Sequence, residues 1–336
     1  MIKEGIKLSV EGNNLSEEQM TGAMRDIMEG NATDAQIGAF LTALRMKGET
    51  VEEITGAAKV MREKVAGIKA PEYTVDTCGT GGDMSHTFNI STTTALIVAA
   101  CGVPVAKHGN RSVSSSCGSA DVLEALGIKI DLEPQKVEKC LAETGFGFMF
   151  APLFHPAMKY AIGPRKEMGI RTVFNILGPL TNPAGAERQV LGVFSDKLTE
   201  PMAKVLGNLG VKHAFVVHGE DGLDEITNTD KTRITELKNS TIKTYFIAPE
   251  DFNLPKGRRD DLAGGNADNN ALITIDILKG KTGPRRDIVL MNAAAALMAG
   301  DRADNFNQGI TAAAEAIDSG AALKKLEEIK EVSNKL

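Results

Sequence analysis

Apolar residues recur at helical spacing through the first 70 residues of the chain, where three such stripes follow one another. Each stripe begins just after a hydroxyl residue that has Glu or Gln three positions later, at Ser16, Thr33 and Thr50. This spacing is typical of a capping box at a helix N-terminus. The apolar positions are Met20, Ala23, Met24, Ile27 and Met28, then Ile37, Phe40, Leu41 and Leu44, then Ile54, Ala57, Val60 and Met61. The pattern predicts a small all-α domain over residues 1–70.

From Tyr73 the pattern changes to short apolar strands that alternate with helices. We expect strands at 73–76 and 103–106, a strongly apolar helix at about 93–101, and a second helix that begins with Ser119 as its N-cap. Strands joined by a helical crossover run parallel. Because the loops that follow parallel strands lie at one edge of the sheet, the loops after both strands should face one crevice.

The same alternation continues to the C-terminus. Residues 134–144 and 287–298 have helical patterns, and residues 189–194 and 213–218 are typical of buried strands. We therefore expect an α/β domain over residues 71–336, with a mostly parallel central sheet flanked by helices. The turn-rich segment at about 155–185 is expected to pack back against the helical domain.

Composition and charge limit the classes of partner. Aromatic residues make up 4% of the chain and Trp is absent, which argues against platforms that stack nucleic-acid bases. The net charge of −6 excludes a basic field over the surface, so we expect no nucleic-acid partner. The four cysteines form no CxxC pair, the N-terminus lacks a signal-peptide pattern, and the longest apolar run is about 12 residues. We expect reduced thiols, no membrane partner and a cytoplasmic location.

Two loops have the composition of phosphate sites. The loop after the strand at 103–106 supplies three cations, Lys107, His108 and Arg111, followed by serines and glycines. The loop after the strand at 73–76 reads Gly-Thr-Gly-Gly-Asp from Gly79. Backbone amides, hydroxyls and cations without bulky side chains are what an anionic phosphate requires. A single loop of this kind could be an ordinary connection, but two at one sheet edge favour a phosphate crevice.

An acidic loop and an isolated arginine add candidate chemistry. Four carboxylates lie within six residues after the strand at 213–218, from Glu220 to Glu225. Alone they fit a solvated turn or a cation site equally well, but a polyphosphate crevice at the same edge favours magnesium. Arg165 follows Gly163 and Pro164, where it is either a solvated residue or a clamp for an anionic ligand.

Together these motifs resemble the anthranilate phosphoribosyltransferase family over nearly the whole chain. The matching segments are 79–83, 87–92, 107–127, 155–160, Arg165, 171–180 and 218–225. The resemblance implies a magnesium-dependent glycosyltransferase of tryptophan biosynthesis, which joins phosphoribosyl pyrophosphate to the amine of anthranilate and releases pyrophosphate. It also implies the fold of the pyrimidine nucleoside phosphorylases and a homodimer formed through the helical domain.

The resemblance also implies roles for matching positions. Lys107, Arg165, Asp224 and Glu225 would be catalytic, and anthranilate would face Gly79, Asn110 and Arg165. Magnesium, expected as two ions, would bind Ser91, Asp224 and Glu225. The role of His108 is open between orienting the aromatic acid and structural support. Phosphoribosyl pyrophosphate would contact Gly79, Gly82, Asp83, Thr87, Asn89, Ile90, Ser91, Thr92, Lys107, His108, Gly109, Asn110, Arg111, Ser112, Val113, Ser114, Ser115 and Ser119.

Three other functions remain as alternatives. A pyrimidine nucleoside phosphorylase-like enzyme would not need the pair Asp224 and Glu225 for pyrophosphate. A related phosphoribosyltransferase with another acceptor would be less consistent with Asn110 and Arg165. An inactive protein that binds nucleic acid or a partner would not need intact loops. The chain departs from the family pattern at 84–86, where Met-Ser-His follows the aspartate and the family often has glycine, and at Cys117, where serine is usual.

Overall fold

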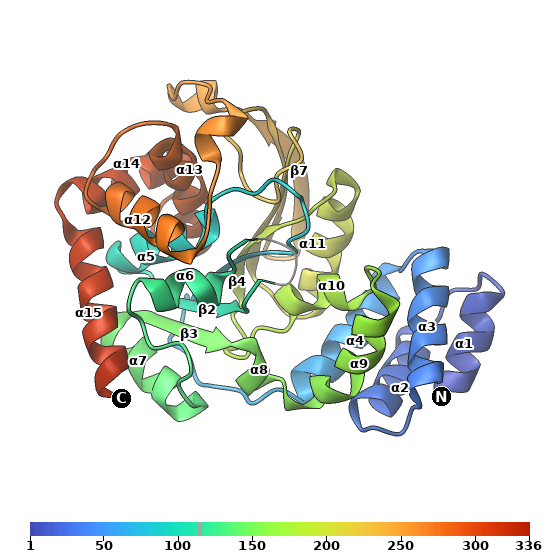
Figure 1. Ribbon diagram of the computed structural model, residues 1–336. Helices are drawn as coiled ribbons and strands as arrows, with labels where there is room; N and C mark the ends of the chain where they lie inside the picture. Colours follow the sequence, from blue (N-terminus) through green and yellow to red (C-terminus); the bar gives the residue numbers. More distant parts are fainter. Residues whose placement is uncertain (113–115) are drawn as a thin grey trace.

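The computed structural model describes residues 1–112 and 116–336 and shows two parts, a helical bundle and an α/β unit (Figure 1). The bundle contains α1 (Ile2–Val10), α2 (Glu17–Met28), α3 (Asp34–Lys47) and α4 (Val51–Glu63). All three predicted capping boxes are confirmed: Ser16, Thr33 and Thr50 each accept a hydrogen bond from the amide three residues later. Helix α1 was not predicted, since no capping signal precedes it.

A seven-stranded sheet forms the centre of the α/β unit, in the order β3-β2-β1-β4-β5-β6-β7. The five strands β1 to β5 pair in parallel, which confirms the predicted fold class and the parallel pairing of the first two strands. The hairpin of β6 and β7 adds two antiparallel strands that we did not predict. The strands are β1 (Val75–Gly79), β2 (Val105–Gly109), β3 (Phe146–Phe150), β4 (Arg188–Gly192), β5 (His213–Gly219), β6 (Thr232–Lys238) and β7 (Thr241–Ile247).

The first two strands begin two residues later than predicted. Tyr73 has a left-handed backbone (φ 62°), which is incompatible with an extended strand. Pro104 has no amide hydrogen to donate, and its carbonyl accepts from Val75. Both strands also end later than predicted, at the first glycine of the following loop. Gly79 and Gly109 therefore lie at the carboxyl edge of the sheet.

Helices cover both faces of the sheet (Figure 1). Along β5, Phe215 and Val217 belong to the core beneath α5 and α13, whereas Ala214 and Val216 belong to a second core shared with the bundle. This alternation follows from the two-residue period of a strand. The helices are α5 (Ile90–Ala100), α6 (Ser119–Ala125), α7 (Pro134–Thr144), α8 (Ala151–Phe154), α9 (Lys159–Met168), α10 (Phe174–Leu177), α11 (Thr199–Asn208), α12 (Ala267–Leu278), α13 (Pro284–Ala299), α14 (Phe306–Asp318) and α15 (Ala321–Lys335).

The segment with α9 and α10 lies between the bundle and the sheet (Figure 1). Ala161, Phe174 and Leu177 are buried in the core that also holds the apolar stripes of α2, α3 and α4. Helix α9 packs directly on α3. Among the described residues, no helix combines the length and apolar character needed to cross a bilayer.

Candidate active site

The glycine-rich loop after β1 is fastened to its surroundings through its backbone. The Thr80 amide donates to the Gly192 carbonyl at 2.9 Å, and the Gly81 amide donates to the Asp224 carboxylate at 2.7 Å. Gly81 and Gly82 have φ of 67° and 78°, a conformation that glycine adopts at no steric cost. Gly79 is required for another reason, because a Cβ there would lie 2.4 Å from Asp224 Oδ2. The close approach of the acidic loop thus explains the glycine.

The acidic loop after β5 reaches across the same edge. Glu225 Oε1 accepts a hydrogen bond from the Ser91 amide at 3.1 Å, in the first turn of α5. Asp221 is turned inward to its own loop, where it accepts from Thr227 Oγ1 at 2.7 Å. Glu220 is exposed. Two of the four carboxylates in the motif therefore face the predicted phosphate crevice, and the other two do not.

Carboxyl groups cluster where these loops meet. Burial raises the pKa of Asp224 well above its usual value, and repulsion from Asp83 and Glu225 raises it further. Burial likewise raises the pKa of Glu225 to about 8, although Lys107 opposes the shift. Such repulsion between neighbouring carboxylates is relieved by a bound cation.

The residues present fit a magnesium site that the substrate would complete. Within residues 1–112 and 116–336, no three His, Cys, Asp or Glu side chains are grouped to hold an ion by themselves. Asp224, Glu225 and the Ser91 hydroxyl supply hard oxygen donors at one place. Magnesium commonly takes one or two carboxylates and completes its shell with water and phosphate oxygens. The donor set therefore suits magnesium that binds together with a phosphorylated ligand.

Lys107 is buried beside this site, where it contacts β1 and the first turn of α5. Its side chain is 1% exposed, and its ammonium donates to the Thr77 carbonyl at 2.5 Å and to Ser91 Oγ at 3.4 Å. Burial lowers the pKa of Lys107, and the buried carboxylate of Asp76 opposes that shift. The lysine is therefore placed to offset the charges of Asp76 and Glu225 and to orient Ser91, and its burial limits direct contact with a ligand.

The start of α5 places the motif 87–92 beside the loops. Thr87 forms an antiparallel bridge with Ala263, and Phe88 is buried beneath it. The side chain of Asn89 bonds Cys117 and Asn270 instead of capping its own helix. Ile90, Ser91 and Thr92 form the first turn of the helix. The Ile90 amide donates to the Phe88 carbonyl and the Ser91 amide to Glu225, so the start of α5 is bonded mainly to protein groups.

In the basic loop, Asp121 joins the two described ends. Its carboxylate accepts from the amides of Ser112 and Gly118 at 3.1 and 2.8 Å, and from Arg111 at 2.9 Å. The N-cap of α6 is Gly118, so the prediction of Ser119 was one residue late; Asp121 takes the cap's amide, and no serine oxygen is needed. Val113, Ser114 and Ser115, predicted to contact phosphate, lie outside the described residues.

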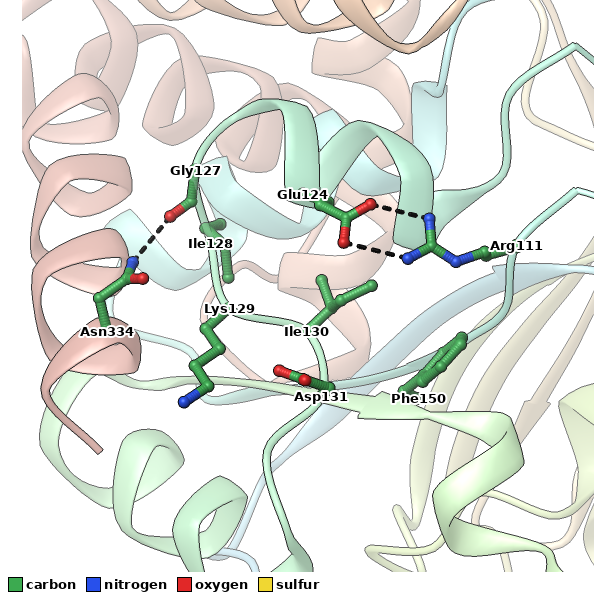
Figure 2. Close-up of a pocket in the computed structure, with 9 residues that line it drawn as sticks. All are labelled: Arg111, Glu124, Gly127, Ile128, Lys129, Ile130, Asp131, Phe150 and Asn334. Carbon is green, nitrogen blue, oxygen red and sulfur yellow. Dashed lines mark hydrogen bonds and ion pairs between the residues drawn. The ribbon is translucent and has the colours of Figure 1, made fainter.

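Arg111 is engaged on the outer surface. Its guanidinium pairs with Glu124 at 2.8 and 3.0 Å, beside a pocket of about 350 Å³ (Figure 2). Ile128, Ile130 and Phe150 form the apolar side of this pocket. A role of Arg111 in phosphate binding stays a prediction and would require it to leave Glu124. The neighbouring Asn110 is exposed.

Two further groups are a histidine pair, formed by β2 and the residue after α8, and Arg165 on α9. The Nε2 atoms of His108 and His155 are 3.1 Å apart. Burial lowers the pKa of His108 to about 3, with a further contribution from His155, and burial lowers the pKa of His155 to about 4. Arg165 on α9 is half-buried, with its Cζ 5.0 Å from the centre of the Phe174 ring. Both histidines are therefore neutral near pH 7, and Arg165 provides the positive charge.

Sequence reasoning gave no role to three residues that organise the site. His155, Asp121 and Arg171 lie within motifs that we had identified, but nothing in their spacing shows which partner each would meet. Asp121 had a usable signal, since an acidic residue three positions after a glycine can cap a helix.

The chain matches the model of the glycosyl transferase family, helical bundle domain, over residues 3–65, and that of its a/b domain over residues 71–323. Anthranilate phosphoribosyltransferase of Acetivibrio thermocellus is 57% identical over 99% of this chain and 97% of its own length. The crystal structure of the Thermus thermophilus enzyme superposes with a TM-score of 0.93 at 40% identity, covering 98% of this chain and 99% of that one. The Saccharomyces cerevisiae enzyme in complex with PRPP and Mg has a TM-score of 0.90 at 30% identity, covering 100% and 98%.

Proposed function

This chain belongs to the anthranilate phosphoribosyltransferase family, and we propose that its crevice transfers the phosphoribosyl group of phosphoribosyl pyrophosphate to anthranilate. The family predicted from the motifs is thereby confirmed. One observation carries the assignment of the site: the acidic loop bonds both the glycine-rich loop, at Gly81, and the start of α5, at Ser91. The convergence gives one edge of the sheet amides for phosphate and carboxylates for a metal ion.

The reaction breaks the bond between ribose C1 and the pyrophosphate oxygen and forms a bond from C1 to the anthranilate nitrogen, which then loses a proton. Anthranilate's amine is an aniline and is neutral at pH 7, so it needs no strong base to prepare it. Positioning of the amine and stabilisation of the leaving group therefore supply the rate enhancement. When bound, magnesium would neutralise negative charge on the departing pyrophosphate.

The chain's own groups divide this work. The amides of Gly82 and Asp83 bind phosphate oxygens, since those of Thr80, Gly81 and Ser91 already donate to Gly192, Asp224 and Glu225. Asp224 and Glu225, with Ser91, would hold magnesium, and the positive charge of Lys107 favours the ionised form of Glu225. Arg165 clasps the carboxylate of anthranilate, since a guanidinium can donate two parallel hydrogen bonds to a carboxylate.

Several finer assignments belong to the same proposal. We propose two magnesium ions, a cytoplasmic location, a division at residue 70 into helical and catalytic domains, and a homodimer formed through the helical side. Exposed apolar side chains on that side, including Met46 and Ile162, support a contact between copies. Mass measurement by light scattering at micromolar concentration tests the dimer.

The test of the function is a coupled assay with the purified protein. With phosphoribosyl pyrophosphate, anthranilate and Mg²⁺, the protein should release one pyrophosphate for each anthranilate consumed. The consumption of anthranilate is measured by the loss of its fluorescence. Phosphate with a pyrimidine nucleoside should give no free base. Pyrophosphate release that anthranilate does not stimulate would contradict the acceptor, and phosphorolysis of the nucleoside would favour the phosphorylase alternative.

A further inference from the structure

Arg171 contacts the glycine-rich loop from the segment that follows α9, the helix that carries Arg165. It follows the left-handed Gly169 that ends α9, in the short connection to α10. Its guanidinium donates a hydrogen bond to the Gly82 carbonyl, and its Cζ lies 4.7 Å from the centre of the Phe194 ring. The arginine thus lies over an aromatic ring while it donates to a backbone oxygen of the loop.

The backbone at Gly82 is shaped for this contact. A Cβ on Gly82 would lie 2.4 Å from one guanidinium nitrogen of Arg171 and 2.8 Å from its Cζ. Gly82 also has a left-handed φ of 78°, which side chains rarely adopt. The guanidinium therefore occupies the space that any other residue at position 82 would need.

The contact completes a set of three anchors on consecutive residues. The Thr80 amide is bound by Gly192 at the end of β4, and the Gly81 amide is bound by Asp224 of the acidic loop. The Gly82 carbonyl is bound by Arg171, and Arg171 alone of these three partners comes from the segment that carries Arg165. The Phe194 amide donates to Thr80 Oγ1 at 3.2 Å, so the ring beneath Arg171 is itself tied to the loop.

Fixing this carbonyl has a consequence for anion binding. In a trans peptide the carbonyl and the following N–H point in opposite directions. A cation that fixes the direction of the Gly82 carbonyl therefore fixes the direction of the Asp83 amide as well. A loop of glycines would otherwise sample several orientations of this peptide, and the loss of that freedom would weaken binding.

We propose that Arg171 is a positioning residue that holds the glycine-rich loop in its phosphate-binding form. It also links this loop to α9, the helix that carries Arg165. The inference rests on the proposed function, because it takes phosphoribosyl pyrophosphate as the ligand of that loop. It makes the affinity for phosphoribosyl pyrophosphate, and not the intrinsic affinity for anthranilate, depend on Arg171.

The test compares Arg171→Met and Arg171→Lys with the matched control Arg188→Met. Arg188 also lies over an aromatic ring, Tyr73 at 4.5 Å, and donates to a carbonyl, that of Ala299 at 2.5 Å; it differs from Arg171 in an added ion pair with Asp301 at 2.8 Å. It lies at the first residue of β4, at the opposite edge of the sheet from the crevice. The control therefore loses a stacked guanidinium of the same kind at a place remote from the phosphate loops.

We expect Arg171→Met to raise KM for phosphoribosyl pyrophosphate at least tenfold, with a smaller change in kcat. Binding of anthranilate alone, measured by its fluorescence, should change less than threefold. Arg171→Lys should give an intermediate KM, since an ammonium can donate to the carbonyl but lacks the planar face for stacking. Arg188→Met should lower the melting temperature and leave KM unchanged.

A wild-type KM in Arg171→Met with only a lower melting temperature would overturn the inference. Equal weakening of the binding of phosphoribosyl pyrophosphate and of anthranilate would overturn it as well. If Arg171→Met does not fold, a wild-type KM in Arg171→Lys would overturn it. Failure of the proposed function is distinguishable, because the wild-type protein would then show no anthranilate-dependent release of pyrophosphate.

Discussion

Asp224 accepts a hydrogen bond of 2.7 Å from the amide of Gly81, although the two residues are 143 positions apart in the chain. The bond fixes one oxygen of a carboxylate whose other neighbours, Asp83 and Glu225, repel it. The bond therefore joins the acidic loop directly to the glycine-rich loop. Changes to the charge of the acidic loop should alter metal binding more than they alter folding.

Neutralising the acidic pair, as Asp224→Asn with Glu225→Gln, should abolish metal-dependent turnover and leave the protein folded. The pKa values of both carboxyl groups are raised in the folded protein, so their ionised forms oppose folding at neutral pH. Amides of the same shape remove that repulsion. We expect an apo melting temperature at least equal to that of the wild type and little turnover at any Mg²⁺ concentration.

Glu220→Gln is the matched control for this pair, because Glu220 is an exposed carboxylate of the same loop. It should have wild-type activity and the wild-type dependence on Mg²⁺. Near-normal turnover of the double variant at low Mg²⁺ would contradict the metal assignment, and an unfolded apo-protein would show that the loop is structural.

Arg165→Ala should weaken the binding of anthranilate and leave that of phosphoribosyl pyrophosphate nearly unchanged. A hydrogen bond to a charged group contributes roughly 1.5–3 kcal/mol, which corresponds to an affinity loss of about 10- to 150-fold. The neighbouring exposed Lys166, changed to Ala, should have no such effect. Titration of each variant with each substrate decides the matter, since equal weakening of both substrates by Arg165→Ala would mean that its role is misassigned.

The parts that the sequence predicted well depend on local or periodic signals. The three capping boxes involve residues three positions apart, so their hydrogen bonds follow from the helix itself. Parallel pairing of β1 with β2 follows from the helical crossover between them. Because the glycine-rich loop and the basic loop both follow parallel strands, their common edge could be expected from the order of the elements alone.

The parts that the sequence did not predict depend on contacts between distant residues. The burial of Lys107 arises because β1 and α5 surround its side chain, although its motif predicted a cation open to phosphate. Arg171 reaches Gly82 across 89 positions. Helix α1 and the hairpin of β6 and β7 were missed because the first lacks a capping signal and the second has its outer face exposed to solvent.

The His108 and His155 pair should make folding stability sensitive to acid. Their pKa values in the folded protein are about 3 and about 4, below the usual 6.5, so the unfolded chain takes up protons that the folded protein does not. The contribution of this pair to stability should therefore be fully present above pH 6.5 and fall as the pH drops below it. At pH 5.5 the loss should be about 1.4 kcal/mol for each histidine.

Chemical denaturation at pH 7.5 and pH 5.5 measures the sum of this loss and the opposite contribution of Asp224 and Glu225, whose pKa values are raised in the folded protein. The change in stability from pH 7.5 to pH 5.5 should be more favourable in the double variant His108→Asn with His155→Gln than in the wild type, because the histidine loss is absent and the contribution of Asp224 and Glu225 remains. Because the comparison uses the difference, a general destabilisation by the substitutions does not affect it. An equal pH dependence in both proteins would contradict the assignment of the acid sensitivity to this pair.

Met84→Gly should stabilise the protein by roughly 1 kcal/mol, because Met84 has a left-handed backbone conformation that favours glycine. Met84 follows the glycine-rich motif with a φ of 56°, and its side chain is 79% exposed. A left-handed conformation costs a residue with a Cβ roughly 1–2 kcal/mol. Glycine removes that cost, although part of the gain is lost because glycine gives the unfolded chain more freedom.

Met84→Ala separates the backbone effect from that of the side chain, because alanine removes the exposed thioether but keeps the Cβ. Denaturant unfolding of the three proteins should therefore rank the glycine variant above both the alanine variant and the wild type. In ordinary backbone conformations the order is the reverse, since alanine restricts the unfolded chain more than glycine does. An alanine variant more stable than the glycine variant would show that residue 84 does not keep its left-handed conformation in solution, and that the departure from the family's glycine carries no cost in strain.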